Sequence, residues 1–412
     1  MELKVKYQYS YFLYPYVIDE DKYERYIIKL LKDKNCELKI FEKEKDLDLY
    51  NYFHPNIRDN FFPTFELRGE ILKEFNDLSV EKKGRKLSDY SCVCFDYKMA
   101  EDIQGKMGNE NGIFFNIPKI EIICFKTGIC FLSIKTHIEG SENFADLLNF
   151  NYKFKEINSE FSDLKKFENI NIQTGIYKDS KKITDVINEI AGDSKKVDLV
   201  NNKFYTFSYA CIPSDYWNDR NEFENLESEF LKYANTFPSS YIVGINKNND
   251  DQNLSVISKM KYSRTGITNM NCNLLCSTAD MYNYTKLPYE YETMIYYTYV
   301  LRLYQKLFLN YINSEFKSYE KIIRIRRKFI EFTNSLWSKD ITNDDTGSLY
   351  YKMLNESLEI EELFEQIGKK YEIIYKDLNI EKNNRDNIIV VMLLIASLVL
   401  NTITILSYLY LR

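Results

Sequence analysis

The chain contains 412 residues, with 55 Lys and Arg against 61 Asp and Glu, and has a formal net charge of −6 at pH 7. Because nucleic-acid-binding surfaces are usually basic, this charge balance argues against DNA or RNA as a partner. The length is sufficient for two or three domains. Tyrosine and phenylalanine are abundant, at 35 and 27 residues, whereas Gly and Pro number only 13 and 7, so we expect a large ordered core with few flexible linkers.

Eight cysteines are scattered along the chain, and the only histidines are His54 and His137. A zinc site would need a second cysteine pair or a histidine cluster close to the first pair. The sequence has neither, so we expect no metal site and no cofactor, and cysteines that stay reduced in the core of a cytosolic domain. The first ten residues lack the apolar stretch of a signal peptide.

Residues 1–285 are expected to form a mixed α/β cytoplasmic domain. Aromatic and β-branched stretches predict strands at 4–16, 37–41, 91–96, 113–116, 121–125, 129–137, 203–212 and 241–245. The fifth and sixth of these are joined by Lys126-Thr-Gly128, which is a good hairpin turn. Residues 21–32 and 222–234 carry apolar side chains at helical spacing and predict helices.

From residue 289 the pattern changes to sustained helix. Residues 289–337 contain no Pro or Gly, and residues 338–347 form a polar turn rich in Asp, Asn and Thr. A second helix is expected to begin at 348 and to continue without a break to 411, over a length of about 95 Å. A helix of this length needs partners to cover its apolar stripe, and other copies of the chain would supply them. We therefore expect a long antiparallel helical stalk at 286–385.

The last stretch, 387–411, contains no charged residue, Pro or Gly. An apolar run of this length predicts a membrane-spanning helix, because about 20 helical residues cross the hydrocarbon core. Lys382 and Arg385 precede it closely, which favours an inner (plasma) membrane protein with a single span at 386–412 and a cytoplasmic bulk. The expected fold class is thus α+β, with an α/β domain, a helical stalk and one C-terminal transmembrane helix.

Six residues of this predicted span share one helix face. They are Val390, Leu394, Ser397, Asn401, Thr404 and Tyr408. Polar side chains inside a membrane usually face a bundle interior or a water-filled path. One interpretation is a hydrogen-bonded seam between copies; the other is a pore lined by polar rings, with the two apolar residues forming a gate that closes by dewetting. Both interpretations require a homo-oligomer in the lipid bilayer.

A long helix, a polar turn and a second helix that runs into a membrane span together resemble the CorA family of pentameric cation channels. Residues 329–332 with Trp337, and residues 358–364, are similar to the stalk of these proteins, and residues 128–135 and 149–154 to their α/β domain. The resemblance implies a homopentamer with a pore helix continuous with its stalk. The Gly-Met-Asn signature and the second span of the family are absent from this sequence. A divalent metal cation transporter for magnesium or cobalt is therefore the alternative.

A CorA-like chain without that signature also resembles the CorA-type membrane effectors associated with type III CRISPR systems. This likeness implies an antiviral defence function and a nucleotide second messenger, a conjugate of S-adenosylmethionine and AMP, as the ligand of the α/β domain. Such a ligand needs a cation for phosphate and hydroxyls or amides beside it. Ser263, Arg264 and Thr265 follow a strand-like stretch at 255–261 and are the candidate ligand-binding residues. An ordinary solvated loop arginine is the other interpretation of Arg264.

Enzyme motifs are missing from the sequence, which has no phosphate-binding glycine loop, no HExxH and no GxSxG. Asp340, Asp344 and Asp345 are explained by a polar turn, so we expect no catalytic residues and no enzyme. The leading hypothesis is a ligand-gated homo-oligomeric channel or membrane-perturbing effector. The other alternative is a tail-anchored sensor or scaffold without a pore.

Overall fold

The computed structural model describes residues 3–98, 104–108, 112–156, 170–174, 177–192, 203–244, 254–315, 322–373, 376, 391–394 and 397. Contacts divide the chain into two units, Met1–Ile360 and Glu361–Arg412. All of the strands, and the helices up to Ser357, belong to the first unit.

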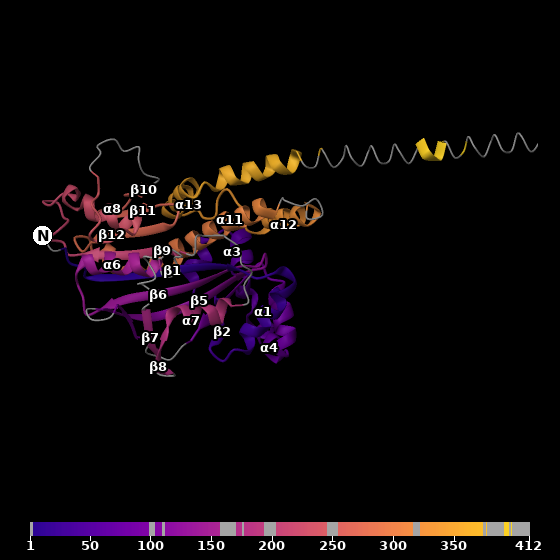
Figure 1. Cartoon of the computed structure of the whole chain (residues 1–412), viewed down its shortest axis with the longest axis horizontal. Coiled ribbons are helices and arrows are strands. Elements are labelled where there is room, and N and C mark those ends of the chain that lie inside the picture. The colour runs from indigo at the N-terminus through magenta and orange to yellow at the C-terminus, as the bar shows by residue number, and fades with distance from the viewer. Residues whose placement is uncertain are drawn as a thin grey trace, which may run out of the picture. The chain divides into compact units, whose positions relative to one another are not determined.

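A mixed β-sheet forms the centre of the first unit, and it contains 12 strands within the described residues (Figure 1). The strands are β1 (Tyr7–Val17), β2 (Cys36–Leu38), β3 (Cys92–Tyr97), β4 (Gln104–Met107), β5 (Ile113–Phe125), β6 (Ile129–Glu139), β7 (Ile170–Thr174), β8 (Tyr177–Lys182), β9 (Tyr205–Ile212), β10 (Ser255–Ile257), β11 (Ser263–Ile267) and β12 (Asn271–Ser277). Their order is β10-β11-β12-β9-β1-β6-β5-β4-β7-β8, with β3 beside β5 and β2 beside β3. The β9–β12 pair is parallel, and the other described pairs are antiparallel.

The predicted hairpin at 121–137 is confirmed. β5 and β6 pair antiparallel, with Cys124 opposite Cys130, and Gly128 in the turn has a φ of 88°. Glycine adopts this left-handed backbone at no steric cost, which is why the turn forms from its local sequence. By contrast, the predicted strand at 241–245 is wrong over its described part, because residues 241–244 form no strand.

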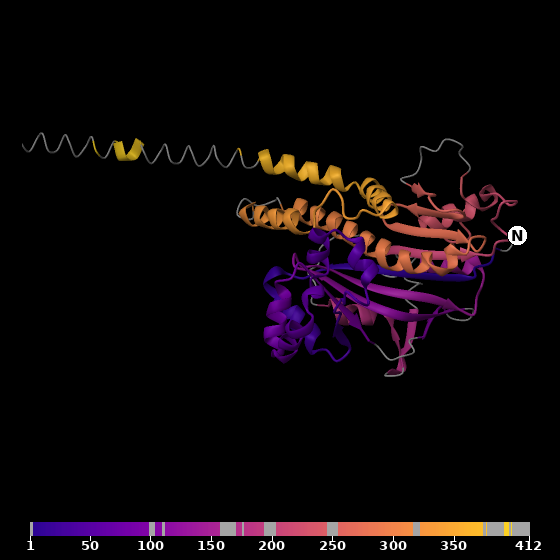
Figure 2. The same ribbon diagram turned by 180° about the vertical axis from the view of Figure 1, so that it is seen from behind.

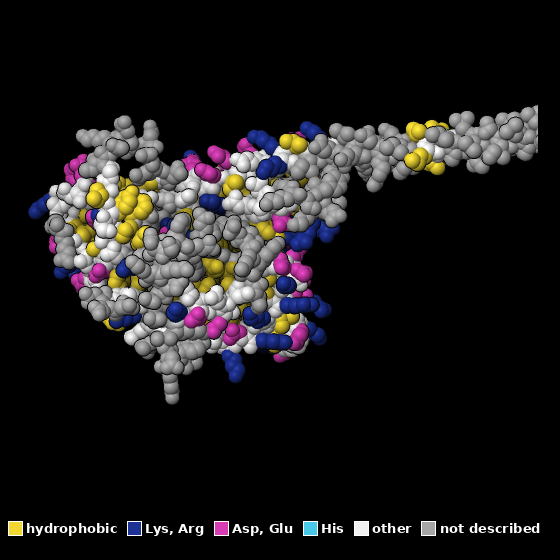
Figure 3. All heavy atoms as spheres, in the orientation of Figure 1, with side chains coloured by type: hydrophobic (Ala, Val, Ile, Leu, Met, Phe, Trp, Pro, Cys, Tyr) yellow, Lys and Arg dark blue, Asp and Glu magenta, His cyan; other side chains and the backbone are white. Residues whose placement is uncertain are grey.

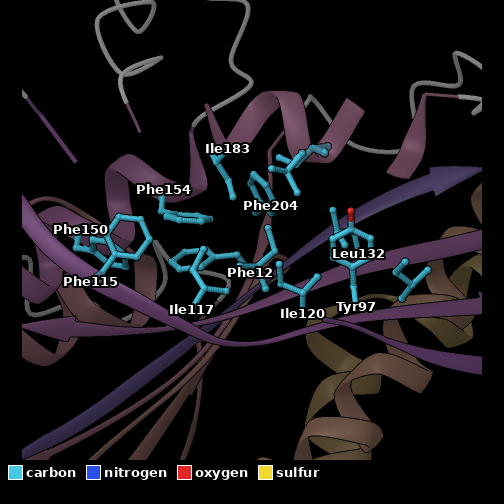
Figure 4. Packing of buried hydrophobic residues seen from close by; sticks show 14 of the residues in the cluster. Phe12, Tyr97, Phe115, Ile117, Ile120, Leu132, Phe150, Phe154, Ile183 and Phe204 are labelled. Carbon is cyan, nitrogen blue, oxygen red and sulfur yellow. The ribbon is translucent and has the colours of Figure 1, made fainter. Parts of the chain in front are cut away.

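One face of the sheet carries the main hydrophobic core. The helices on this face are α1 (Glu20–Lys32), α4 (Gly69–Asp77), α5 (Val80–Ser88), α6 (Phe144–Lys155), α7 (Ile183–Ala191), η3 (Phe223–Leu226) and α8 (Glu227–Asn235). Their apolar side chains pack against alternate residues of the strands, because successive strand residues point to opposite faces. Phe12 of β1 stacks on Phe154 of α6 with ring centroids 4.1 Å apart, and Leu132 of β6 lies in the same cluster (Figure 4).

The opposite face is covered by helices that lie early and late in the chain. They are α2 (Leu47–Tyr52), α3 (Pro55–Phe61), η1 (Pro63–Glu66), α9 (Tyr282–Thr285), α10 (Leu287–Glu290), the π-helix η5 (Tyr291–Ile295), α11 (Tyr296–Glu315), α12 (Ile322–Ser335) and α13 (Asp345–Ser357). Tyr304 of α11 stacks on Phe125 of β5 at 3.8 Å, and Tyr291 stacks on Phe207 of β9 at 4.2 Å. The view from behind shows α11 and α13 on the same side of the sheet (Figure 2).

The surface over α1 and α4 carries basic and acidic side chains interspersed with one another (Figure 3). Two ion pairs join α1 to α5, Lys32 with Glu81 at 3.0 Å and Arg85 with Glu24 at 3.8 Å. Exposed pairs of this kind contribute little to stability. The buried residues Tyr26, Ile27 and Leu30 therefore hold α1 on the sheet.

The predicted long antiparallel stalk is wrong. In place of one helix over 289–337, the structure has η5, α11 and α12, and the aromatic side of α11 packs on the sheet of the same chain, with Tyr299 and Leu303 fully buried. The second helix is also interrupted. α13 ends at Ser357, and Glu359 has a φ of 54°, a left-handed conformation that a continuous α-helix cannot contain. A helix resumes at 360–373.

The prediction of a single-pass inner-membrane protein is also corrected. Within the described parts of the chain, no helix is both long enough and apolar enough to cross a bilayer. Of the predicted span at 386–412, the structure describes residues 391–394 and 397 as helical. The structure thus gives no support to the membrane and ion-channel expectations.

The predicted pore-lining residues are only partly within the described residues. Leu394 lies in the helical turn 391–394, where its side chain is 59% exposed, and Ser397 is also helical. Val390, Asn401, Thr404 and Tyr408 lie outside the described residues.

Candidate ligand-binding pocket

A cavity of about 270 Å³ lies in the first unit between the β10–β12 end of the sheet and α13. Its walls come from segments that are far apart in the sequence. Tyr52 comes from α2, Leu274 from β12, Ile295 from η5 and Tyr350 from α13. The cavity therefore exists only because α2, early in the chain, and α13, late in this unit, pack on the same face of the sheet.

β11 places two of the three predicted ligand-binding residues in the cavity. Ser263 and Thr265 both line it. The hydroxyl oxygen of Thr265 lies 2.5 Å from the phenol oxygen of Tyr350, so the two groups share a hydrogen bond at the floor of the cavity. The hydroxyl of Ser263 donates to the carbonyl of Met260 at 3.0 Å.

Arg264 lies on the other face of the sheet. Its guanidinium carbon is 3.7 Å from the ring centroid of Phe223, on the side covered by α8. The reason is the two-residue period of a strand, which turns the residue between Ser263 and Thr265 away from them. Burial lowers the pKa of Arg264, in keeping with its position against that ring. The predicted trio is thus divided between two surfaces, and Arg264 is not a group of the cavity.

The π-helix η5 forms one wall. Tyr291, Met294 and Ile295 of this short element line the cavity, and Tyr291 is fully buried. The phenol of Tyr291 donates to the carbonyl of Cys272 at 2.9 Å, which fixes the ring against β12. Single π-helical turns inside a longer helical run are frequent at functional sites.

Two carboxylates line the cavity where it reaches solvent, the half-buried Glu290 at the end of α10 and the exposed Asp344 just before α13, and we call this side its mouth. The phenol of Tyr282 donates to Glu290. Burial raises the pKa of Tyr282, and the neighbouring carboxylates of Glu290 and Asp344 raise it further. Both carboxylates therefore lie close enough to act on the same hydroxyl. Lys259 is the one basic residue among the described residues that line this cavity, and it is exposed.

Asp344 also caps α13. Its side-chain oxygen accepts a hydrogen bond from the backbone N–H of Gly347 at 2.6 Å, as an N-cap residue does. Only glycine fits at position 347 without a shift of Tyr52, because a Cβ there would be 2.3 Å from the Tyr52 phenol oxygen. That phenol also lies 3.0 Å from the hydroxyl of Thr298 in α11. The cap, the glycine and the tyrosine together hold the start of α13 at the cavity.

The cavity presents neutral hydroxyls inside and carboxylates outside. Burial raises the pKa of Tyr350 and of Tyr52, so both phenols stay protonated and act as hydrogen-bond donors at neutral pH. The hydroxyl of Ser263 donates to a backbone carbonyl, not to a general base. The chemistry on offer at this site is recognition by hydrogen bonds and ring contacts.

Sequence reasoning missed most of this site. It identified Ser263 and Thr265 but none of the residues of α10 and η5, and it interpreted Asp344 only as part of a polar turn. A signal for the strand was available, because Ser263, Thr265 and Ile267 alternate with Arg264 and Gly266. Seven of the eight cysteines are buried, as expected for core residues, and Cys36 is half-buried.

Replacing Thr265 with valine tests the hydrogen bond at the cavity floor. The buried phenol of Tyr350 would lose its partner, and we expect the free energy of unfolding to fall by about 1–3 kcal/mol. Tyr350→Phe removes the same bond from the other side. The double variant should cost clearly less than the sum of the two single variants in urea denaturation. Strict additivity would show that the two hydroxyls do not interact.

Comparison with protein-family models, with curated proteins and with solved structures finds no match to this chain. The likeness to CorA proteins, and the pentamer and nucleotide messenger that it implies, therefore stay predictions from the sequence.

Proposed function

We propose that the first unit is a ligand-sensing module that binds a small organic molecule in the cavity between β11 and α13. The observation that carries this proposal is the cavity itself, with apolar and aromatic walls and a few hydroxyls that converge at its floor. Pockets with this composition are the usual binding sites for small molecules. Leu274, Ile257 and Tyr291 supply the apolar surface, and Ser263 and Thr265 supply polar contacts.

The size of the cavity bears on the ligand. Its volume of about 270 Å³ is just below the range of roughly 300–1,000 Å³ that small-molecule pockets usually have. One ring system with a short substituent suits this volume better than two joined nucleosides. A conjugate of S-adenosylmethionine and AMP stays a candidate to be tested, although Arg264, the cation expected to bind its phosphate, lies on the opposite face of the sheet.

The position of α13 supports a sensing role. A ligand in the cavity would contact Tyr350 on this helix and Asp344 at its N-cap. α13 is followed by the left-handed residue Glu359, after which the helix at 360–373 begins. Occupancy would therefore stabilise the helix that leads into the last part of the chain. Self-association and a role in antiviral defence remain predictions from the sequence.

A thermal-shift screen of the full 412-residue chain tests the proposal. The panel contains nucleosides, the S-adenosylmethionine–AMP conjugate, aromatic amines and aromatic acids. A ligand present at 100 times its Kd should stabilise the fold by about 2.7 kcal/mol and raise the Tm by a few degrees. Met294→Trp, which places a large side chain in the cavity, should abolish the shift.

Arg264→Gln is the matched control, because it changes β11 on the face that points away from the cavity. It should leave the ligand-induced shift intact. A ligand that stabilises the wild type and Met294→Trp equally binds elsewhere, and that result would contradict the proposed site.

A further inference from the structure

The charges at the mouth of the cavity specify the class of ligand, and this inference rests on the proposed function above. Glu290 and Asp344 face the same phenol, that of Tyr282. Within the described residues neither carboxylate forms an ion pair with a lysine or arginine. Among the described lining residues of the cavity, two are therefore negatively charged, and one, Lys259, is positively charged. This balance attracts a cation and repels an anion.

The interior behind these carboxylates is apolar and aromatic. Leu274, Leu287 and Tyr291 are almost fully buried there, and the phenol of Tyr350 shares a hydrogen bond with the hydroxyl of Thr265. Tyrosine faces attract cations as well as packing against flat rings. Met260 and Met294 add flexible thioethers, which pack well on aromatic rings. The site therefore combines buried apolar walls with two carboxylates at its mouth.

A ligand that matches this arrangement has an aromatic body and a positively charged group a short chain away from it. We propose that the cavity binds an aromatic amine, with its ring among Tyr291, Leu274 and Tyr350 and its ammonium group at the mouth between Glu290 and Asp344. A hydroxyl on the far side of the ring would meet Ser263 and Thr265. Phosphorylated ligands fit less well, because the carboxylates oppose them at the entrance.

A series of probes with one body and three charges tests this assignment on the full-length protein. Tyramine is the cation, 4-ethylphenol is its neutral counterpart and 4-hydroxyphenylacetate is the anion. By isothermal titration, tyramine should bind about 10- to 100-fold more tightly than 4-ethylphenol, the range that a charged hydrogen bond contributes. The anion should bind more weakly than the neutral probe.

Conservative variants then separate the charge from the shape. Glu290→Gln and Asp344→Asn keep hydrogen-bonding groups, and asparagine is still a good N-cap residue. Each should weaken tyramine binding about tenfold or more while leaving 4-ethylphenol unchanged. Asp345→Asn is the matched control, because Asp345 is the next residue along and is not among those that line the cavity. This control should bind tyramine as the wild type does.

The outcomes distinguish this inference from the proposed function. The amine assignment would be overturned if 4-ethylphenol or 4-hydroxyphenylacetate bound as tightly as tyramine or more tightly. If Met294→Trp still abolished that binding, the result would support the pocket. Failure of all three probes would also overturn the amine assignment, while a hit from the wider thermal-shift panel would still support the pocket. Tyramine binding that is unaffected by Met294→Trp and by both carboxylate variants would overturn both ideas.

Discussion

Replacing Glu121 with glutamine is expected to lower the free energy of unfolding by about 3–5 kcal/mol, the usual cost of removing one partner from a buried ion pair. Glu121 is fully buried in β5, and one of its oxygens lies 2.5 Å from the ammonium nitrogen of Lys39. The same oxygen accepts a hydrogen bond from the phenol of Tyr297 at 2.8 Å, and Lys119 lies 3.6 Å away. Glutamine keeps the shape but leaves the ammonium groups of Lys39 and Lys119 without their main countercharge.

A double-mutant cycle separates the ion pair from the loss of packing. Lys39→Met removes the ammonium group that lies closest to Glu121 and keeps an apolar stem. The double variant Glu121→Gln/Lys39→Met should be clearly more stable than the sum of the single losses predicts. Denaturant titrations with an unchanged m value would measure this coupling. A loss below about 1 kcal/mol for Glu121→Gln alone would contradict the expectation, because exposed pairs contribute that little.

The same carboxylate should make stability depend on pH. Burial by itself would raise the pKa of Glu121, but the ammonium groups of Lys119 and Lys39 outweigh burial and lower the pKa to about 2. An unfolded glutamate titrates near about 4.3. The stabilisation from Glu121 is therefore complete above about pH 4.3 and is lost as the pH falls from there towards about 2. The difference in unfolding free energy between wild type and Glu121→Gln should shrink across this window and stay constant above it.

Gly128→Ala should be strongly destabilising. A Cβ on Gly128 would lie 2.2 Å from the backbone oxygen of Ile18, and the φ of 88° is unfavourable for alanine. Neither backbone can easily move away, because the N–H of Ile18 donates to the carbonyl of Gly128 at 2.8 Å. We expect a loss of about 3 kcal/mol or more, measured as a shift of the denaturation midpoint.

Gly140→Ala is the matched control for this prediction. Gly140 also has a positive φ, 72°, but a Cβ there meets nothing within 4 Å. It should cost only the backbone penalty of a left-handed alanine, about 1–2 kcal/mol. The difference between the two variants isolates the contact with Ile18. Equal losses in both would show that the contact has no energetic weight.

Helices and turns of this protein could be predicted where a few neighbouring residues carry the signal. Residues 21–32 carry a helical pattern and form α1 over Glu20–Lys32, and Lys126-Thr-Gly128 forms the expected turn. Turn chemistry and amphipathic spacing act within a few residues, so they need no information about distant parts of the chain. Of the helix predicted over 289–337, α11 at Tyr296–Glu315 and α12 at Ile322–Ser335 are helical. Periodicity shows that the apolar side of α11 must be covered, but it does not show that the sheet of the same chain covers it.

The amino-acid sequence alone indicated strands that include β1, β3, β6 and β9 and helices that include α1 and α11, and it identified Ser263 and Thr265 as residues of interest. Only the tertiary structure decided that the sheet of the same chain covers α11, that Glu359 interrupts the helix after α13, and that Arg264 points away from its neighbours. It also brought Tyr52, Glu290 and Asp344 to one cavity. The physical reason is that secondary structure follows from short-range backbone and side-chain preferences. A binding site depends on which distant surfaces pack together to remove apolar area from water.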